Sequence, residues 1–464
     1  MKNLKNLKNL MFLFLGLILV TSCSDDDDGP VQFVPTNSIV ELAQATPQLS
    51  SLVTALVKYP DLVDLLSNDG TFTVFAPNND AFAALLGAIG QTSIDDIPED
   101  VLKSVLQHHV FASAALEASA VTSGTITMAG GETVEVVADA NGVFLDNAQV
   151  IAVDVLGSNG VVHIINSVLV PPSMLPIVGT IVAPAYFNKD FTTLIAAVLS
   201  ADTDILGLLL GNGPSDGGLT LFAPTNAAFE AAGVTDVNGA DAVLAYHVID
   251  GTIMASMLPT TNGVSSEVPT LGGNIYLTNA GSGVFINGTT EVVATDIAGS
   301  NGVVHVIDRV LLPPTQTINE IVAGFAGGNP GEFTLLAAAL GRAGLADFFS
   351  GNGPYTVFAP TDAAFQAAGF ADAAAINAAP VDAVAGILTH HVAEPNVYVF
   401  STDLTDGASV PMLNGQNVTI NLGDSTVQDA SGSTPAAGLI PSLLNVHATN
   451  GVVHVIDKVL LPSS

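Results

Sequence analysis

The strongest constraint on this chain of 464 residues is an internal repeat that occurs three times. Each copy has a Phe-Ala-Pro motif early and an Asn-Gly-Val-Val-His motif late. These motifs begin at Phe75, Phe222 and Phe358, and end at His163, His305 and His454. The copies recur at intervals of about 140 residues, the length of a globular domain and far longer than one solenoid turn. The sequence therefore predicts three similar domains in a row.

Each repeat predicts the same order of elements. It opens with an apolar stripe at helical spacing, continues with a short strand that ends at the Ala-Pro step, and adds a short capped helix. The stripes are Leu49, Leu52, Val53 and Leu56, then Phe191, Leu194, Ile195 and Val198, then Phe333, Leu336, Ala337 and Leu340. The predicted N-caps are Asn78, Thr225 and Thr361, and the residues predicted to turn inward are Phe82, Phe229 and Phe365.

A β-hairpin closes each repeat. Its turn is predicted as type I′ at Asn159-Gly160, Asn301-Gly302 and Asn450-Gly451. The Val-Val-His strand that follows is apolar on both faces, so it is expected to be buried. These elements predict an α+β class, with a central antiparallel sheet or sandwich and small helices around it.

Together these motifs resemble the fasciclin domain in three tandem copies, which cover residues 36–172, 176–314 and 317–462. The matching features are Phe-Ala-Pro-Thr-x-x-Ala-Phe, a Tyr/His-His-Val centre and Asn-Gly-Val-Val-His-Val-Ile-Asp-x-Val-Leu-x-Pro. The resemblance implies a wedge-shaped antiparallel β-sandwich with flanking small helices. It also implies an extracellular module for adhesion or matrix binding, and no enzyme.

The N-terminus predicts export. Lys2, Lys5 and Lys8 precede the apolar run 11–20, which is too short to span a bilayer, and residues 1–22 are predicted to be a signal peptide. Val20-Thr21-Ser22-Cys23 resembles the bacterial lipoprotein signal, so Cys23 is the expected lipid attachment site. Residues 23–35 include four consecutive aspartates and are expected to form an acidic tether.

The charge of the chain excludes one class of partner. There are 43 acidic residues against 9 basic ones, and the net charge is −34. Such a surface repels phosphate backbones and disfavours anionic lipid surfaces. We therefore expect no nucleic-acid partner, and contact with the membrane only through the lipidated N-terminus.

One candidate contact site is the residue pair at the centre of each repeat. His108-His109, Tyr246-His247 and His390-His391 correspond to a Tyr-His pair that the fasciclin family associates with receptor contact. Neighbouring residues on a strand face opposite ways. His108, Tyr246 and His390 are therefore candidates for ligand contact, and the second members are expected to pack inside.

A second candidate site lies five residues before each hairpin asparagine. Asp154-Val155 and Asp296-Ile297 resemble the Asp-Ile pair with which some animal fasciclin domains contact integrins, and the third repeat has Asn445-Val446 instead. These residues are candidates for ligand contact. The alternative interpretation is that the aspartate shapes a turn.

The remaining conspicuous polar residues are interpreted as structural. His163, His305 and His454 are expected to be buried neutral imidazoles, and Asn159, Asn301 and Asn450 to form the hairpin turns. The Gly213-Pro-Ser215-Asp-Gly217 segment matches a nucleophile elbow only in letters, because a helix precedes it and a strand follows it. No catalytic residue, metal site or cofactor is predicted.

The leading functional hypothesis is a lipid-anchored adhesion protein on the outer membrane. It would face the cell exterior, with the periplasm as second choice, and bind matrix, biofilm or host and neighbour-cell ligands, protein or glycan. The alternative is a glycan-binding accessory lipoprotein of a nutrient-uptake system, which at this charge would prefer neutral glycans or need Ca²⁺. Weak self-association is a further expectation.

Overall fold

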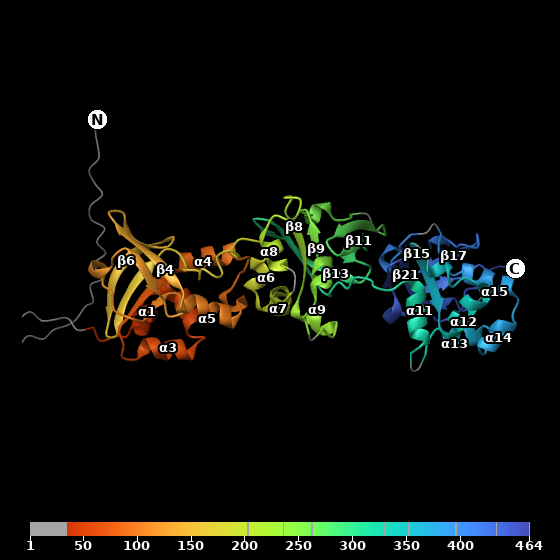
Figure 1. Cartoon of the computed structure of the whole chain (residues 1–464), viewed down its shortest axis with the longest axis horizontal. Coiled ribbons are helices and arrows are strands. Elements are labelled where there is room, and N and C mark those ends of the chain that lie inside the picture. The colour runs from red at the N-terminus through yellow and green to blue at the C-terminus, as the bar shows by residue number, and fades with distance from the viewer. Residues whose placement is uncertain are drawn as a thin grey trace, which may run out of the picture.

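A computed structural model describes residues 35–463 apart from 202–203, 235, 261–262, 329–330, 351–352, 395–396 and 433. The predicted signal peptide, Cys23 and all of the predicted tether except residue 35 lie outside these residues. The described chain forms three modules that follow one another along one long axis (Figure 1).

The first module has five helices and seven strands among its described residues. The helices are α1 (Ile39–Ala45), α2 (Ser50–Leu56), α3 (Pro60–Ser67), α4 (Asn79–Ala88) and α5 (Glu99–Gln107). The strands are β1 (Phe72–Pro77), β2 (Val110–Phe111), β3 (Gly124–Thr127), β4 (Thr133–Asp139), β5 (Gly142–Leu145), β6 (Ala148–Gly157) and β7 (Gly160–Ile165).

The second module repeats this plan with shorter helices. The helices are α6 (Ala183–Tyr186), α7 (Thr192–Ser200), α8 (Ile205–Leu210), α9 (Asn226–Ala231) and α10 (Asp241–Tyr246). The strands are β8 (Leu219–Pro224), β9 (Val248–Asp250), β10 (Ser266–Thr270), β11 (Gly273–Asn279), β12 (Val284–Ile286), β13 (Thr290–Gly299) and β14 (Gly302–Ile307).

The third module keeps the plan with shorter strands. The helices are α11 (Ile318–Ala326), α12 (Thr334–Ala343), α13 (Asp362–Ala367), α14 (Ala373–Ala378) and α15 (Val381–Thr389). The strands are β15 (Tyr355–Pro360), β16 (Ser409–Pro411), β17 (Asn417–Asn421), β18 (Thr426–Gln428), β19 (Ala437–Gly438), β20 (Val446–Ala448) and β21 (Gly451–Ile456).

The sheets share one topology. The first module has the strand order β2-β1-β7-β6-β5-β4-β3, and the second has the equivalent order β9-β8-β14-β13-β12-β11-β10. In the third module the sheet is divided into β15-β21-β20 and β16-β17-β18-β19. The pairings are antiparallel except that the first and last strands of each module (β1–β7, β8–β14, β15–β21) run parallel. The sandwich is thus antiparallel around one parallel pair.

That parallel pair lies between two apolar layers, which explains why its strands are apolar on both faces. In the first module Val74 and Val162 pack against the helices. Phe75 and Ile165 point the other way, into the core enclosed by the rest of the sheet. The wedge therefore has a helical side and a sheet side that share these two strands.

The opening helix and the capped helix predicted in each repeat are confirmed, but other helices were not predicted, among them α5, α10 and α15 before the central residue pairs. Helices α2, α7 and α12 carry the predicted stripes except for the first residue of each stripe, which is the N-cap residue of its helix. Asn78, Thr225 and Thr361 each accept the hydrogen bond of an N-cap. The predicted inward phenylalanines of the capped helices are buried. Helices α1 and α11 were not predicted either, although Ser38-x-x-Glu41 and Thr317-x-x-Glu320 form capping boxes at their starts.

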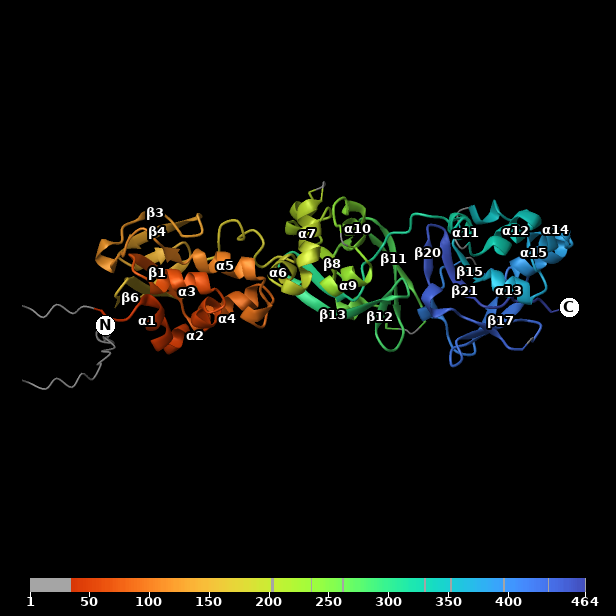
Figure 2. The same ribbon diagram turned by 90° about the horizontal axis from the view of Figure 1, so that it is seen from below.

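Neighbouring modules are in contact (Figure 2). One buried apolar cluster runs from the first module into the second, and the Gln91 Nε2 donates to the Pro184 carbonyl over 3.0 Å. At the next junction the Asp403 carboxylate accepts hydrogen bonds from Ser265 and Thr278 over 2.6–2.9 Å. These contacts restrict motion between modules.

Candidate functional site

The mid-strand histidines connect two parts of each module. His163 is 1% exposed, and its Nδ1 accepts from the Asp154 backbone N–H over 3.3 Å. Because Nδ1 accepts, Nε2 carries the proton, and it donates to the Leu116 carbonyl over 2.7 Å. His305 and His454 repeat both bonds in their own modules. Burial lowers the pKa of His454, which favours the neutral ring.

The residues bonded by these histidines share a left-handed backbone, which in the first and second modules lies at a β-bulge between the last two strands. Asp154, Asp296 and Asn445 have φ of 56°, 59° and 56°, a left-handed conformation that Asp and Asn tolerate better than most side chains. Each side chain accepts a backbone N–H over 2.7 Å, from Ala118, Ala255 and Ser401 respectively. This geometry favours the turn-shaping interpretation of the aspartate. The contact interpretation stays a prediction.

The bulge of the second module and the equivalent Asn445-Val446 of the third module lie at the junctions. Ile297 packs against the apolar cluster shared with the first module, close to Gly90. The Asn445 Nδ2 donates to the Gly288 carbonyl of the second module over 3.0 Å. Among the described residues no module precedes Asp154-Val155, so only the first bulge is not covered in this way.

The expected exposure of His108, Tyr246 and His390 is wrong. All three are at most 1% exposed, and they lie where α5, α10 and α15 end, not on a strand. At a helix end, neighbouring side chains need not point to opposite faces, so both members of each pair turn inward. The Tyr246 hydroxyl donates to the Asn274 carbonyl over 2.7 Å, and burial raises the pKa of Tyr246 to about 12.

The second members of the pairs, His109, His247 and His391, are here called the bridging histidines. In the first module the His109 Nδ1–H donates to the Val105 carbonyl over 2.7 Å, and Nε2 accepts from the Leu169 N–H over 2.9 Å. The other two make equivalent bonds. Burial lowers the pKa of each bridging histidine to about 4, so the rings are neutral at pH 7.

The hairpin asparagines hold three segments together. The Asn159 Oδ1 accepts from the Ile39 N–H over 2.9 Å, and its Nδ2 donates to the Leu66 and Asn68 carbonyls over 2.8 and 2.9 Å. Asn301 makes the same set of bonds, and Asn450 bonds Ile318 and Phe349 in the same way.

The predicted type I′ turn at Asn-Gly is wrong. In the first module Gly157 pairs with Gly160, so the two loop residues are Ser158 and Asn159. A type I′ turn needs positive φ at both loop residues, and of the three residues after Gly157 only Gly160 has it, at 154°. A Cβ on Gly160 would lie 2.1 Å from the Phe72 carbonyl oxygen, so this position is glycine because the first strand passes so close.

An aromatic cluster at the junction of the second and third modules was not predicted from the sequence. Tyr276 lies 4.5 Å from Tyr398 and 5.9 Å from His447 between ring centroids. One available signal was a difference between repeats: the position of His447 holds Leu156 in the first repeat and Ala298 in the second. The predicted loop around Ser215 follows α8 and precedes β8, and the Ser215 hydroxyl donates to Asp250.

The described residues contain neither a metal-binding cluster nor a membrane-spanning helix. No three His, Cys, Asp or Glu side chains gather there as a group able to hold a metal ion. None of the described helices has the length and apolar character needed to cross a membrane.

Comparison with known proteins identifies the family. The fasciclin-domain family model matches residues 47–171, 189–313 and 331–462. This chain belongs to the fasciclin-domain family. It consists of three tandem fasciclin domains with the mixed α+β wedge described above.

Similar proteins come from animals and bacteria. The chain is 27% identical to transforming growth factor-beta-induced protein ig-h3 of Sus scrofa over 92% of its own length and 58% of that protein. It is 41% identical to protein sll1483 of Synechocystis over 29% of this chain and 74% of that one. A solved fasciclin domain pair from the insect cell adhesion molecule Fasciclin I aligns at 19% identity and a TM-score of 0.27, over 58% of this chain and 96% of that one. The chain thus spans little more than half of the ig-h3 relative.

Proposed function

We propose that this protein is a lipid-anchored adhesion protein of the outer cell surface that binds extracellular matrix, biofilm or neighbouring cells through its fasciclin domains. The observation that carries the proposal is the end-to-end array of three such domains held by contacts at both junctions. Several weak sites on one restrained array act together, because each bound site raises the effective concentration of the next.

The proposed contact surface is on the first domain, along β6. Asp154 and Val155 are the candidate pair there, and Ile151, Val153 and Leu156 on the same strand are 50%, 49% and 40% exposed. Exposed apolar side chains grouped on one strand are typical of surfaces that contact another protein. The proposal gives less weight to a contact role for His108, Tyr246 and His390, because a buried ring does not reach a partner.

The anchor is tested by Cys23→Ser in a cell that displays the chain. We expect the variant to be released into the medium and the cells to lose attachment to matrix-coated surfaces. Attachment that is equal with and without the protein, on every surface, contradicts the adhesion proposal.

The contact surface is tested by Ile151→Asp, which places a charge among the apolar side chains of β6. We expect weaker attachment with unchanged display. Leu199→Asp is the matched control, because Leu199 is 59% exposed on α7 of the second domain, away from β6. Equal attachment by both variants contradicts a contact role for β6.

A further inference from the structure

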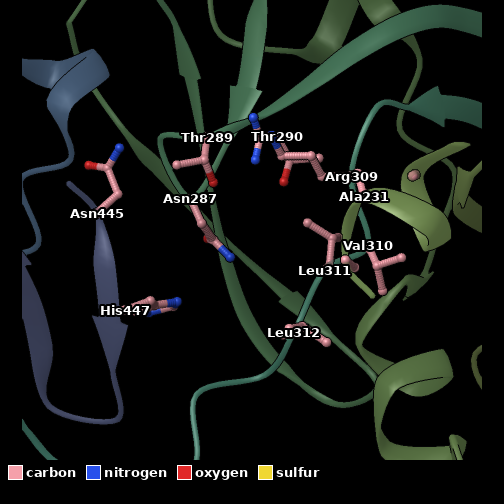
Figure 3. A pocket seen from close by; sticks show the side chains of 12 residues that line it. Ala231, Asn287, Thr289, Thr290, Arg309, Val310, Leu311, Leu312, Asn445 and His447 are labelled. Atoms are coloured by element: carbon pink, nitrogen blue, oxygen red, sulfur yellow. The ribbon is translucent and has the colours of Figure 1, made fainter. Parts of the chain in front are cut away.

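A cavity of about 300 Å³ lies at the junction of the second and third domains (Figure 3). The second domain lines it with the end of α9 and with the segment after β14, which includes Arg309 and Leu312. The third domain lines it with Asn445 and His447. Cavities of this volume are in the range of sites that hold small molecules.

The cavity exists because the second domain has small residues where the first has large ones. Counting from the shared phenylalanine of α4 and α9, Leu85 and Leu86 of the first domain correspond to Ala232 and Gly233 of the second. Helix α4 is also longer than α9, and Gln91 just beyond it bonds the second domain. The apolar cluster against which Leu85 and Leu86 pack continues across the first junction, whereas the second junction keeps space beside its shorter helix.

The chemistry of the lining favours an anion. Among the described residues that line the cavity, Arg309 is the charged one, and none is Asp or Glu. This is notable in a chain with 43 acidic and 9 basic residues. The Arg309 Nε is 3.9 Å from the Asp308 carboxylate, at the limit of an ion pair, so the guanidinium keeps donors for a ligand. The hydroxyl residues Thr289 and Thr290 line the same cavity.

His447 adds a polar group that lacks a partner. Its Nδ1 is buried and makes no hydrogen bond to the described residues. Buried polar side chains nearly always have a partner, so this nitrogen points to one that is supplied from outside the chain. Burial lowers the pKa of His447 to about 4, so the ring is neutral and the positive charge belongs to Arg309 alone.

The apolar part of the lining defines the rest of the ligand. Leu312 is 57% exposed although it lines the cavity, and Ala231 and Ala232 are exposed beside it. We propose that the junction cavity binds a small organic carboxylate, with its carboxylate on Arg309 and its body against Leu312 and α9. This activity is separate from the proposed adhesion and does not depend on it.

The test measures binding by isothermal titration calorimetry with all three domains, in the chain made without the predicted signal peptide and with Cys23→Ser, so that neither lipid nor detergent is present. Hexanoate and glucuronate are the two carboxylate probes, and 1-hexanol and glucose are their neutral counterparts. We expect at least one carboxylate to bind. Its neutral counterpart is expected to have an affinity at least about tenfold lower, because it cannot make the ionic hydrogen bond. Preference for hexanoate assigns the site to apolar acids, and preference for glucuronate to sugar acids.

Two variants place the binding in the cavity. We expect Arg309→Gln to weaken carboxylate binding about tenfold or more. Lys458→Gln is its control, because Lys458 holds the equivalent position in the third domain. We expect Ala231→Phe to block the cavity and Ala367→Phe, the equivalent change on α13, to leave binding unchanged. The proposal is overturned if neither carboxylate binds. It is also overturned if binding is unchanged in both the Arg309→Gln and the Ala231→Phe variants while these variants keep the melting temperature of the unmodified protein.

Discussion

The hairpin asparagine of the first domain makes the sharpest stability prediction. Asn159→Ala removes three hydrogen bonds, two of them fully buried, that join the hairpin to the start of α1 and the end of α3. A hydrogen bond contributes about 1 kcal/mol net, and a buried group left without its partner costs about 1–3 kcal/mol. We therefore expect the free energy of unfolding of the first domain to fall by about 3 kcal/mol or more.

The matched control is Asn141→Ala. Asn141 also ends a two-residue hairpin loop and precedes a glycine with positive φ, but it is exposed and bonds only the neighbouring Asp139. The control therefore keeps the type of turn and removes no buried bond. We expect its effect to stay within about 0.5 kcal/mol.

Hydrogen-exchange mass spectrometry of the full chain gives the assay, because it reads each domain separately. We expect peptides from α1 and β1 to exchange about 100-fold faster or more in the Asn159→Ala variant, which is what about 3 kcal/mol implies. Peptides from the third domain are expected to be unchanged. Equal exchange in the Asn159→Ala and Asn141→Ala variants would refute the argument that the side chain ties the segments together.

Three further predictions follow from close packing, titration and the second junction. Gly302→Ala places a Cβ 2.0 Å from the Leu219 carbonyl oxygen, so we expect urea unfolding to show a free energy of unfolding lower by about 2 kcal/mol or more. Gly324→Ala is the control, because its Cβ meets open space, and we expect it to leave the stability unchanged or to raise it. The bridging histidines have folded-state pKa values near 4, below their ordinary 6.5, so the unfolded chain takes up protons first as the pH falls. Their contribution to the free energy of unfolding is therefore complete above pH 6.5 and decreases towards pH 4, by up to about 3 kcal/mol for each histidine. A free energy of unfolding that is equal at pH 7 and pH 4.5 contradicts this prediction. Asp403→Ala removes the hydroxyl bonds at the second junction, so we expect faster proteolysis between the second and third domains, whereas Asp406→Ala, which bonds only within the third domain, leaves the rate unchanged.

The repeats made the domain plan readable from the sequence, because three aligned copies separate shared features from incidental ones. The N-caps at Asn78, Thr225 and Thr361 were predictable from local spacing alone. The parallel pair was not predicted, since it joins Phe72 to Gly160 across most of a domain. A strand that is apolar on both faces is nevertheless typical of parallel pairing, and that signal was present.

The candidate sites were harder to predict, because their geometry depends on contacts far apart in the chain. Whether His108 is exposed depends on α5 ending just before it, and the three-residue Tyr/His-His-Val motif does not distinguish a helix end from a strand. The hairpin asparagine was assigned to a local turn, whereas its side chain reaches Ile39. Residues at the domain junctions form no periodic pattern in the sequence. A position such as His447 therefore differs between repeats, but the sequence does not indicate which residues it contacts.

The pairing of the opening and closing strands has a consequence for how the chain matures. Strand β1 has no parallel neighbour until β7 has been synthesised, and the same holds for the later domains. Contacts between such distant segments slow folding, because the entropy of closing a long loop is lost before the contacts stabilise the domain. Each unit therefore stays incomplete until its last strand emerges, and the three units finish in N- to C-terminal order, each as its closing strand appears.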